Sequence, residues 1–384
     1  MVEILNLSLG KVAEVKNLYP IDKRGNVLRY STELSDYGRC TFRVSTKDPF
    51  LSTLGDILVP HQYHIRIKRG GTVVWAGLIV NNTSRNRNYI EVEGVEYEFY
   101  LDRVLIRRDS TVVVGDGKNN YRTFASGTLA SAVTSLVTNA KTDFGANHPL
   151  ANMAIGTIEN PDYPLNFFDI QGHALTGAWT FTNFINLQFD YHSAYYVLKA
   201  FGVYSNADFE IDETLTFNFK KFLGVKNNGV TFRYGAQGNI VDYNSPRLGR
   251  RMINDLTGIA ADSDGKILHA NQRDVPSVNT YGLLQSATAY SDVKDLVFLK
   301  SRITEELQFI KTFDDSPLNL VLSEKAYPSS LYGIGDIVTV MIKDNIIDYN
   351  KVRRIVGITV TLHNTGRELT TIQTNRPRDK DMGA

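Results

Sequence analysis

The sequence is poor in cysteine, in net charge and in long apolar runs, and each shortage excludes a class of protein. Cys40 is the only cysteine among 384 residues, so neither an intrachain disulfide nor a cysteine-built zinc site can form. The 42 Lys and Arg residues nearly balance the 41 Asp and Glu residues. A formal charge of +1 argues against a chain built as a whole to coat nucleic acid or an anionic membrane.

No segment has the pattern of a secretion signal or of a membrane-spanning helix. The first residues include Glu3 and lack the basic start and the apolar core of a signal peptide. The longest uncharged stretch, residues 170 to 189, is interrupted by Gln171, His173 and Asn183, which are costly in hydrocarbon. We therefore expect neither export by that route nor a membrane span.

The sequence is rich in aromatic residues and glycine, and it begins with a strand-like unit. It has 20 Tyr, 19 Phe and 29 Gly, a composition that favours sheets over helix bundles. Residues 1 to 105 alternate polar and apolar positions, with hairpin signals at residues 23 to 26 and 68 to 71. Cys40 lies in such an alternating stretch, where we expect it to pack rather than react. These residues predict an antiparallel, barrel-like unit.

Residues 106 to 215 change character and predict an α+β insertion domain. A helix is expected within residues 123 to 141, because six apolar residues recur at helical spacing: Leu129, Ala132, Val133, Leu136, Val137 and Ala140. A second helix is expected at residues 193 to 201, with Asp190 or Ser193 as its N-cap and Gly202 beyond its end. A strand-like segment follows at residues 210 to 219.

The remaining chain predicts a return to strands. Residues 216 to 317 are expected to continue the strands and to hold a hairpin around Asp262 to Gly265 and a linking helix from Ser291 to Leu307. Residues 318 to 375 predict a second barrel, and residues 376 to 384 a flexible tail. The expected fold class is mainly β with α+β insertions, with two tail-tube-like antiparallel β-barrels in the chain.

An internal repeat supports two barrels. Gly55-Asp56-Ile57 precedes Gly77 by the same spacing at which Gly335-Asp336-Ile337 precedes Gly357, and strand-like residues begin equally far beyond each second glycine. In this interpretation the second glycine permits a bend or a close approach of the backbone. The alternative is that Gly-Asp is a common turn and that the spacing is a coincidence.

No motif predicts catalysis, a cofactor or a metal, and we assign no catalytic, cofactor-binding or metal-binding residue. The histidines lack metal spacing, and the two nearest in sequence, His61 and His64, are expected at the surface. Asp262 to Gly265 resembles the start of a calcium loop, but the later ligands are missing and a turn explains it. A phosphate loop and a nucleophile elbow are both absent.

Three small basic clusters are expected to be solvated or to contact other subunits rather than to read nucleic acid. They comprise Arg103, Arg107 and Arg108; Arg247, Arg250 and Arg251; and Lys351, Arg353 and Arg354.

An ordered set of segments resembles a known family. These segments are Glu93 to Leu105, Tyr281 to Val293 with the helix after it, and the closing Gly335-Asp336-Ile337-Val338. Together they resemble the tail hub proteins of long-tailed bacteriophages. That family is similar to the baseplate hubs of contractile phages and to the base of the type VI secretion spike.

The resemblance implies a structural, non-enzymatic homotrimer in the virion tail tip, assembled in the host cytoplasm. Two barrels per chain would form a pseudo-sixfold ring that continues the tail channel, adapts the hexameric tube to a threefold tip and lets DNA pass without specific binding. Implied partners are distal tail and tail tube proteins, tip, fibre or receptor-binding proteins, and the tape measure protein, with no stable membrane insertion. Many relatives carry a C-terminal peptidase or lysozyme, which we do not expect here.

Two other functions stay open at the level of sequence. The aromatic residues 163 to 189 and 191 to 204 could stack on sugars, as in a phage glycan-binding or glycan-degrading tail protein. A hexameric tail tube or distal tail subunit is the second alternative, and two barrels per chain count against it.

Overall fold

The computed structural model describes most of the chain, and strands predominate in it. It describes residues 1–49, 51, 58–86, 88–105, 129–145, 148, 150–160, 193–205, 207–226, 229–235, 238–244, 252–262, 264–290, 293, 296–311, 317–323, 331–344, 348–375 and 377. Within these residues no helix is long and apolar enough to cross a membrane. The segment 170 to 189 and the expected flexible tail lie outside the described residues, apart from Pro377 in the tail.

The first unit is a curled sheet around an apolar core. Its strands are β1 (Val2–Leu5), β2 (Lys11–Val15), β3 (Leu18–Tyr19), β4 (Asn26–Glu33), β5 (Arg39–Ser45), β6 (His64–Arg69), β7 (Thr72–Asn86) and β8 (Tyr89–Val95). They pair in the order β4-β5-β8-β7-β6-β1-β2. Gly70 and Gly71 form the expected tight turn between β6 and β7, both with positive φ. Cys40 is buried in this core, as expected.

The second unit is a closed six-stranded barrel. It consists of β12 (Thr231–Tyr234), β13 (Ile240–Asn244), β17 (Leu318–Leu322), β18 (Ile337–Lys343), β19 (Asp348–His363) and β20 (Glu368–Asn375). The order β18-β12-β13-β17-β20-β19 closes where β18 pairs with β19. All pairs are antiparallel except the two that β12 makes. Because β12 and β13 precede residue 318, this barrel draws two strands from the segment 216 to 317.

The two units repeat one topology. Read in the same direction, the orders are β1-β6-β7-β8-β5-β4 and β12-β18-β19-β20-β17-β13, and equivalent strands also follow one another in the same sequence order. The buried positions agree too, since Cys40, Phe42 and Val44 of β5 correspond to Leu318, Leu320 and Leu322 of β17. The repeat is therefore structural, although β1 and β12 run in opposite directions relative to their neighbours.

The glycine spacing that suggested the repeat is only partly structural. Ile79 and Ile355 occupy equivalent positions, each just before a bulge in its strand, so Gly357 is equivalent to Asn81 and not to Gly77. A Cβ atom on Gly77 would lie 2.1 Å from the Val95 carbonyl oxygen, so this glycine does permit a close approach. Residues 52 to 57, which include the first Gly-Asp pair, lie outside the described residues.

The insertion packs two helices on a small sheet. Its elements are the 3-10 helix η1 (Tyr97–Arg103), α2 (Leu129–Phe144), β9 (Ala154–Ile158), α3 (Ala194–Ser205), β10 (Asp208–Ile211) and β11 (Thr216–Lys220). All six apolar residues expected on the first helix are buried on α2. Ser193 caps α3, because its hydroxyl accepts a bond from the Tyr196 amide at 3.1 Å. Two boundaries were wrong: α3 continues through Gly202, and residues 210 to 219 hold a turn between two strands.

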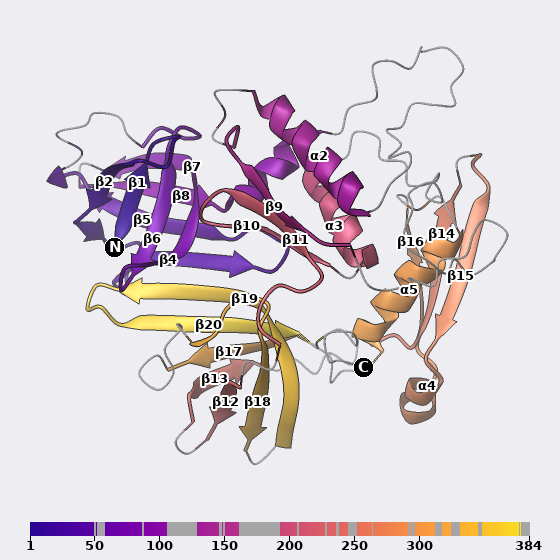
Figure 1. The fold of residues 1–384 in the computed structure, drawn as a ribbon. Helices are drawn as coiled ribbons and strands as arrows, with labels where there is room; N and C mark the ends of the chain where they lie inside the picture. The colour runs from indigo at the N-terminus through magenta and orange to yellow at the C-terminus, as the bar shows by residue number, and fades with distance from the viewer. Residues whose placement is uncertain are drawn as a thin grey trace, which may run out of the picture.

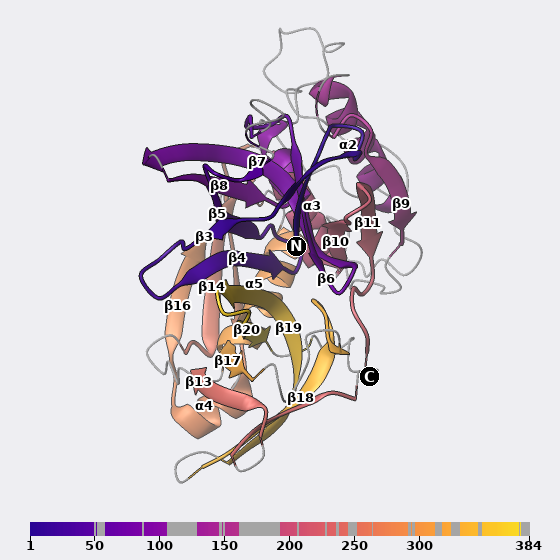
Figure 2. The ribbon, with the colours of Figure 1, turned by 90° about the vertical axis from the view of Figure 1, so that its left-hand side faces the viewer.

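A smaller unit lies to one side of the barrels (Figure 1). It contains β14 (Asp255–Ala261), β15 (Ile267–Arg273), α4 (Val275–Tyr281), β16 (Gln285–Ala289) and α5 (Leu296–Ile310), with α5 packed on the sheet β15-β14-β16. The expected hairpin is confirmed, and Gly265 has a φ of 80° in its turn. Figures 1 and 2 both place the first unit above the second barrel, with β4 beside β19. The fold class, mainly β with tail-tube-like barrels and α+β insertions, is thus confirmed, with the second unit closed and the first an open sheet of the same topology among the described strands.

Replacing Gly335 by alanine should destabilise the fold strongly. Gly335 has a φ of 84°, and a Cβ atom there would lie 2.2 Å from the Leu223 carbonyl oxygen. Gly366 is a matched control, because its φ is 80° but nothing lies within 4 Å of its Cβ position. We expect Gly366→Ala to cost about 1 kcal/mol from backbone strain alone, and Gly335→Ala about 2–4 kcal/mol because the backbones must also separate. Urea unfolding of both variants measures the difference, and equal losses would contradict the close approach.

Candidate assembly interface

The two units are joined by one seam between β4 and β19. Seven residue pairs connect these strands, from Gly357 opposite Glu33 to His363 opposite Asn26. β19 is 16 residues long, and its first half pairs with β18 up to Arg354. Arg354 also pairs with β20 on the opposite edge, so β4 takes over the edge that β18 leaves. One long strand therefore belongs to its own barrel and, beyond the bulge at Gly357, to the seam.

The equivalent strand of the first unit, β7, has the same overhang. β7 is 15 residues long and pairs with β6 up to Leu78, while its other edge pairs with β8 from Leu78 to Asn86. Just beyond Leu78, the Ile79 backbone still forms hydrogen bonds with the backbone of His61 and Tyr63, which precede β6. From Asn81 to Asn86, no strand of the described chain pairs with the edge that corresponds to the seam edge of β19.

The equivalent of β4 in the second barrel, β13, also has an open edge. β13 pairs with β17 along its length but meets β12 only where Ile240 lies opposite Tyr234. Val241 is 56% exposed, and Asp242 and Asn244 are also exposed. The chain thus has one seam in which two strands pair, β4 with β19. Among its described strands it also has two unpaired edges that match the two sides of such a seam. Together, the open edges of β7 (Asn81–Asn86) and β13 (Val241–Asn244) form a candidate assembly interface.

A buried ion pair fixes the second barrel to the insertion. Arg354 of β19 and Asp208 of β10 are each 3% exposed and lie 2.6 Å apart, from Nη2 to Oδ2. The same guanidinium donates to the carbonyl oxygens of Leu223 at 2.9 Å and Gly335 at 3.0 Å, and it covers the Phe222 ring. Every one of these partners compensates the burial of the charge. The pair therefore holds β10, the link after β11 and the barrel in one geometry.

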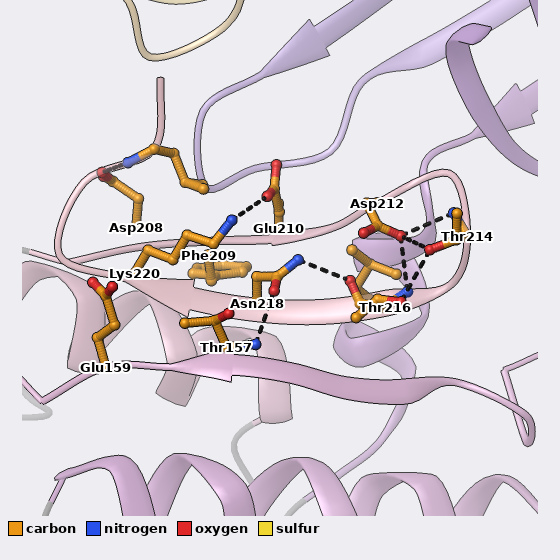
Figure 3. Close-up of polar contacts among 12 residues, drawn as sticks. Thr157, Glu159, Asp208, Phe209, Glu210, Asp212, Thr214, Thr216, Asn218 and Lys220 are labelled. Carbon is orange, nitrogen blue, oxygen red and sulfur yellow. Dashed lines mark hydrogen bonds and ion pairs between the residues drawn. The ribbon is translucent and has the colours of Figure 1, made fainter. Parts of the chain in front are cut away.

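The insertion sheet that carries Asp208 is itself held by polar contacts (Figure 3). The Asp212 carboxylate accepts bonds from the Thr214 and Thr216 amides in the turn between β10 and β11. The Asn218 side chain accepts from the Thr157 amide at 3.0 Å and so ties β11 to β9. The apolar side chains Phe209, Phe217 and Phe219 are fully buried in the core that α2 and α3 share. These contacts hold the sheet together and so fix the position of Asp208 in the ion pair.

Three of the residues considered in the sequence lie elsewhere than expected. His64 was expected at the surface but is completely buried, with Nδ1 3.2 Å from the Tyr97 hydroxyl, and burial lowers the pKa of its ring to about 4. Arg353 and Arg354 were expected to be solvated or to contact other subunits, but both are buried. Arg354 is buried because its charge is paired with Asp208. Period-two alternation predicted the wet face for His64, and a partner from another element overrode that pattern.

Other candidates agree with the expected structural roles. The Asp262 carboxylate accepts bonds from the Asp264 and Lys266 amides, which makes the segment a hairpin turn. His61 is exposed, and no group of three metal-ligating side chains lies within ligating distance among the described residues. Arg107, Arg108, Arg247, Arg250, Arg251 and Asp190 lie outside the described part of the chain, as do residues 163 to 189.

Comparisons with known proteins find similarity in structure alone. No family model matches the chain, and no curated protein matches its sequence. A tail protein from Neisseria meningitidis MC58 superposes with a TM-score of 0.61 at 12% identity, covering 100% of this chain and 98% of that one. The 43 kDa tail protein of prophage MuSo2 from Shewanella oneidensis gives 0.57 at 12% identity, covering 92% and 94%.

A third solved structure, the prophage tail protein gp18 from Listeria monocytogenes, gives a TM-score of 0.55 at 12% identity, with 100% and 97% of the two chains covered. The chain has the fold of prophage tail proteins. The superpositions cover between 92% and 100% of the two chains, so the shared fold is not confined to the barrels. The resemblance found in the sequence is confirmed at the level of the fold.

Removing the Arg354 side chain should release the barrel from the insertion. Arg354→Met leaves Asp208 buried without its partner, and we expect a loss of about 3–5 kcal/mol in unfolding free energy. Lys343 offers a control, because it pairs with Asp348 on the same barrel while both side chains are more than 70% exposed. Lys343→Met should stay within about 0.5 kcal/mol of wild type. Chemical unfolding checks both values, and a small loss for Arg354→Met would show that the pair is dispensable.

Proposed function

We propose that the protein is a structural tail hub of a long-tailed bacteriophage and forms a homotrimeric ring of six barrels. The observation that carries the proposal is the seam between β4 and β19. Because the two units repeat one topology, the same seam can form again between chains, with β13 of one chain against β7 of the next. Three chains with two barrels each then close a ring of pseudo-sixfold symmetry.

The equivalent positions give the register of this second seam. Thr361 pairs with Arg29 in the seam within the chain. Asn86 is the equivalent of Thr361, because Asn86 lies opposite Tyr89 and Thr361 lies opposite Leu369 at equivalent places in the repeat. Asn244 is the equivalent of Arg29 by the same comparison of strand partners. We therefore expect Asn86 of one chain to lie opposite Asn244 of its neighbour.

A ring of this kind gives the protein its role in the virion. Its sixfold outer form fits a hexameric tail tube and its threefold chain symmetry fits a tip, so the ring continues the channel and adapts one symmetry to the other. In this role it contacts distal tail, tube, tape measure and fibre proteins, and DNA crosses without specific binding during ejection. The small net charge of +1 suits such passage. The role requires no enzymatic activity.

Disulfide trapping tests the proposed seam. The only native cysteine, Cys40, is buried, so it should form no crosslinks of its own. The variant Asn86→Cys/Asn244→Cys, oxidised and run on a denaturing gel, should give covalent species of two and three chains and none larger. Tail particles can serve as the source if the isolated chain does not assemble.

Two controls make the result decisive. The Arg29→Cys/Thr361→Cys variant should crosslink within one chain, because these residues already pair in the seam. Each variant with one added cysteine, at position 86 or at position 244, should give no ladder. Species of six chains would favour a hexameric tube subunit, and a failure to crosslink while the seam control succeeds would sink the proposed ring.

A further inference from the structure

A cavity of about 170 Å³ lies where the first unit, the insertion and the second barrel meet. Residues from the end of β4, from β7, from the start of η1 and from β10 line it, together with Leu223 and Ile334. Six carboxyl groups line this cavity, and no Lys, Arg or His does: Glu33, Glu96, Glu98, Glu210, Asp212 and Glu213. We call these six side chains the junction carboxyls.

One oxygen atom of the junction carboxyls has no hydrogen-bond partner. Glu98 is 5% exposed, and its Oε1 atom accepts a bond from the Ile211 amide at 2.5 Å. Its Oε2 atom is buried and has no hydrogen-bond partner. An unpaired buried carboxylate oxygen is costly, so it marks a place where a ligand would be stabilising.

A second carboxyl lies close by and is already oriented. Glu96 accepts bonds from the Thr32 hydroxyl at 2.8 Å and from the Gly38 amide at 2.6 Å. Each of its oxygens keeps a free lone pair. Two oriented acid groups, two residues apart, therefore lie on the wall of one cavity.

The cavity has room for water as well as for an ion. Its volume of about 170 Å³ is enough for several water molecules. No three described side chains converge closely enough to hold a bare ion. Mg²⁺ keeps several of its waters and is bound through one or two carboxylates, so it fits both observations. We propose that the junction carboxyls bind a hydrated divalent cation of this kind, through Glu96 and Glu98.

The protonation of the site supports the proposal. Burial raises the pKa of Glu98 to about 8, and burial and the neighbouring Glu98 raise that of Glu96 well above its usual value. Burial thus favours the protonated form of both acids, and a cation that binds them would displace protons. The charged groups around them are Glu33, Asp36 with Lys199, Glu210 with Lys220, Asp212, Glu213, Arg39 and Arg66.

Cation binding here would join three parts of the molecule. Glu96 and Glu98 belong to the first unit, Ile211 to the insertion, and Leu223 and Ile334 lead to the second barrel. A cation in the cavity would therefore stabilise the same junction as the pair Arg354–Asp208, and its removal would loosen that junction.

Thermal unfolding with and without Mg²⁺ tests the proposal. Millimolar MgCl₂ should raise Tm relative to NaCl of equal ionic strength, and the rise should grow from pH 6 to pH 9, because the carboxyls must lose their protons to bind. Glu98→Gln keeps the shape and the bond to Ile211 but removes the charge, and it should weaken Mg²⁺ binding tenfold or more in a calorimetric titration. Glu14→Gln, at an exposed ion pair, should behave as wild type.

Two results would overturn the proposed cation site: the same Tm rise in Glu98→Gln as in wild type, or no Tm rise in wild type. A rise that is independent of pH also overturns it, because the proton release is then absent. Ca²⁺ as a second probe reports the selectivity of the cavity, and binding of either ion that depends on Glu98 and on pH supports the proposal.

Discussion

The structure depends on one buried charge that has to be satisfied from several directions at once. Arg354 lies at the point where β19 stops pairing with β18, and its guanidinium binds Asp208 of the insertion together with the backbone of Leu223 and Gly335. A buried cation tolerates little displacement of such partners, because each lost bond leaves an unpaired group in an apolar surrounding. The orientation of the insertion on the barrel follows from this geometry, as does the close approach of Gly224 and Gly335 that brings the partners together.

Local features of the fold could be predicted from the sequence, and long-range ones could not. The apolar face of α2, the turn at Gly70 and Gly71 and the hairpin at Asp262 are set by residues close in sequence. By contrast, the pairing of β12 with β18 joins residues more than a hundred positions apart, and no periodicity encodes it. The barrel was therefore recognised with its last four strands but without its first two.

Single residues show the same limit. Alternation predicted a wet face for His64, and the small size of its basic cluster predicted a solvated or subunit-contacting Arg354. A pattern of apolar and polar residues cannot reveal that a charge or a ring finds a partner from another element. The internal repeat was the sequence signal that bears on the candidate interface, yet its glycine spacing did not identify equivalent residues. Gly357 is at a bulge whose equivalent is Asn81, and only the strand pairing reveals this.

The bulges explain why one chain can carry both a finished seam and the halves of another. An open strand edge is a liability for a monomer, because its free backbone groups invite pairing with other chains. In β19 this edge is not left open, because it pairs with β18 up to Arg354 and with β4 from Gly357 onward. β7 has a bulge at the equivalent place and nearly the same length beyond it, but its own chain supplies no described strand to pair there. This open edge, together with the open edge of β13 at the complementary place in the repeat, is what supports the proposed ring.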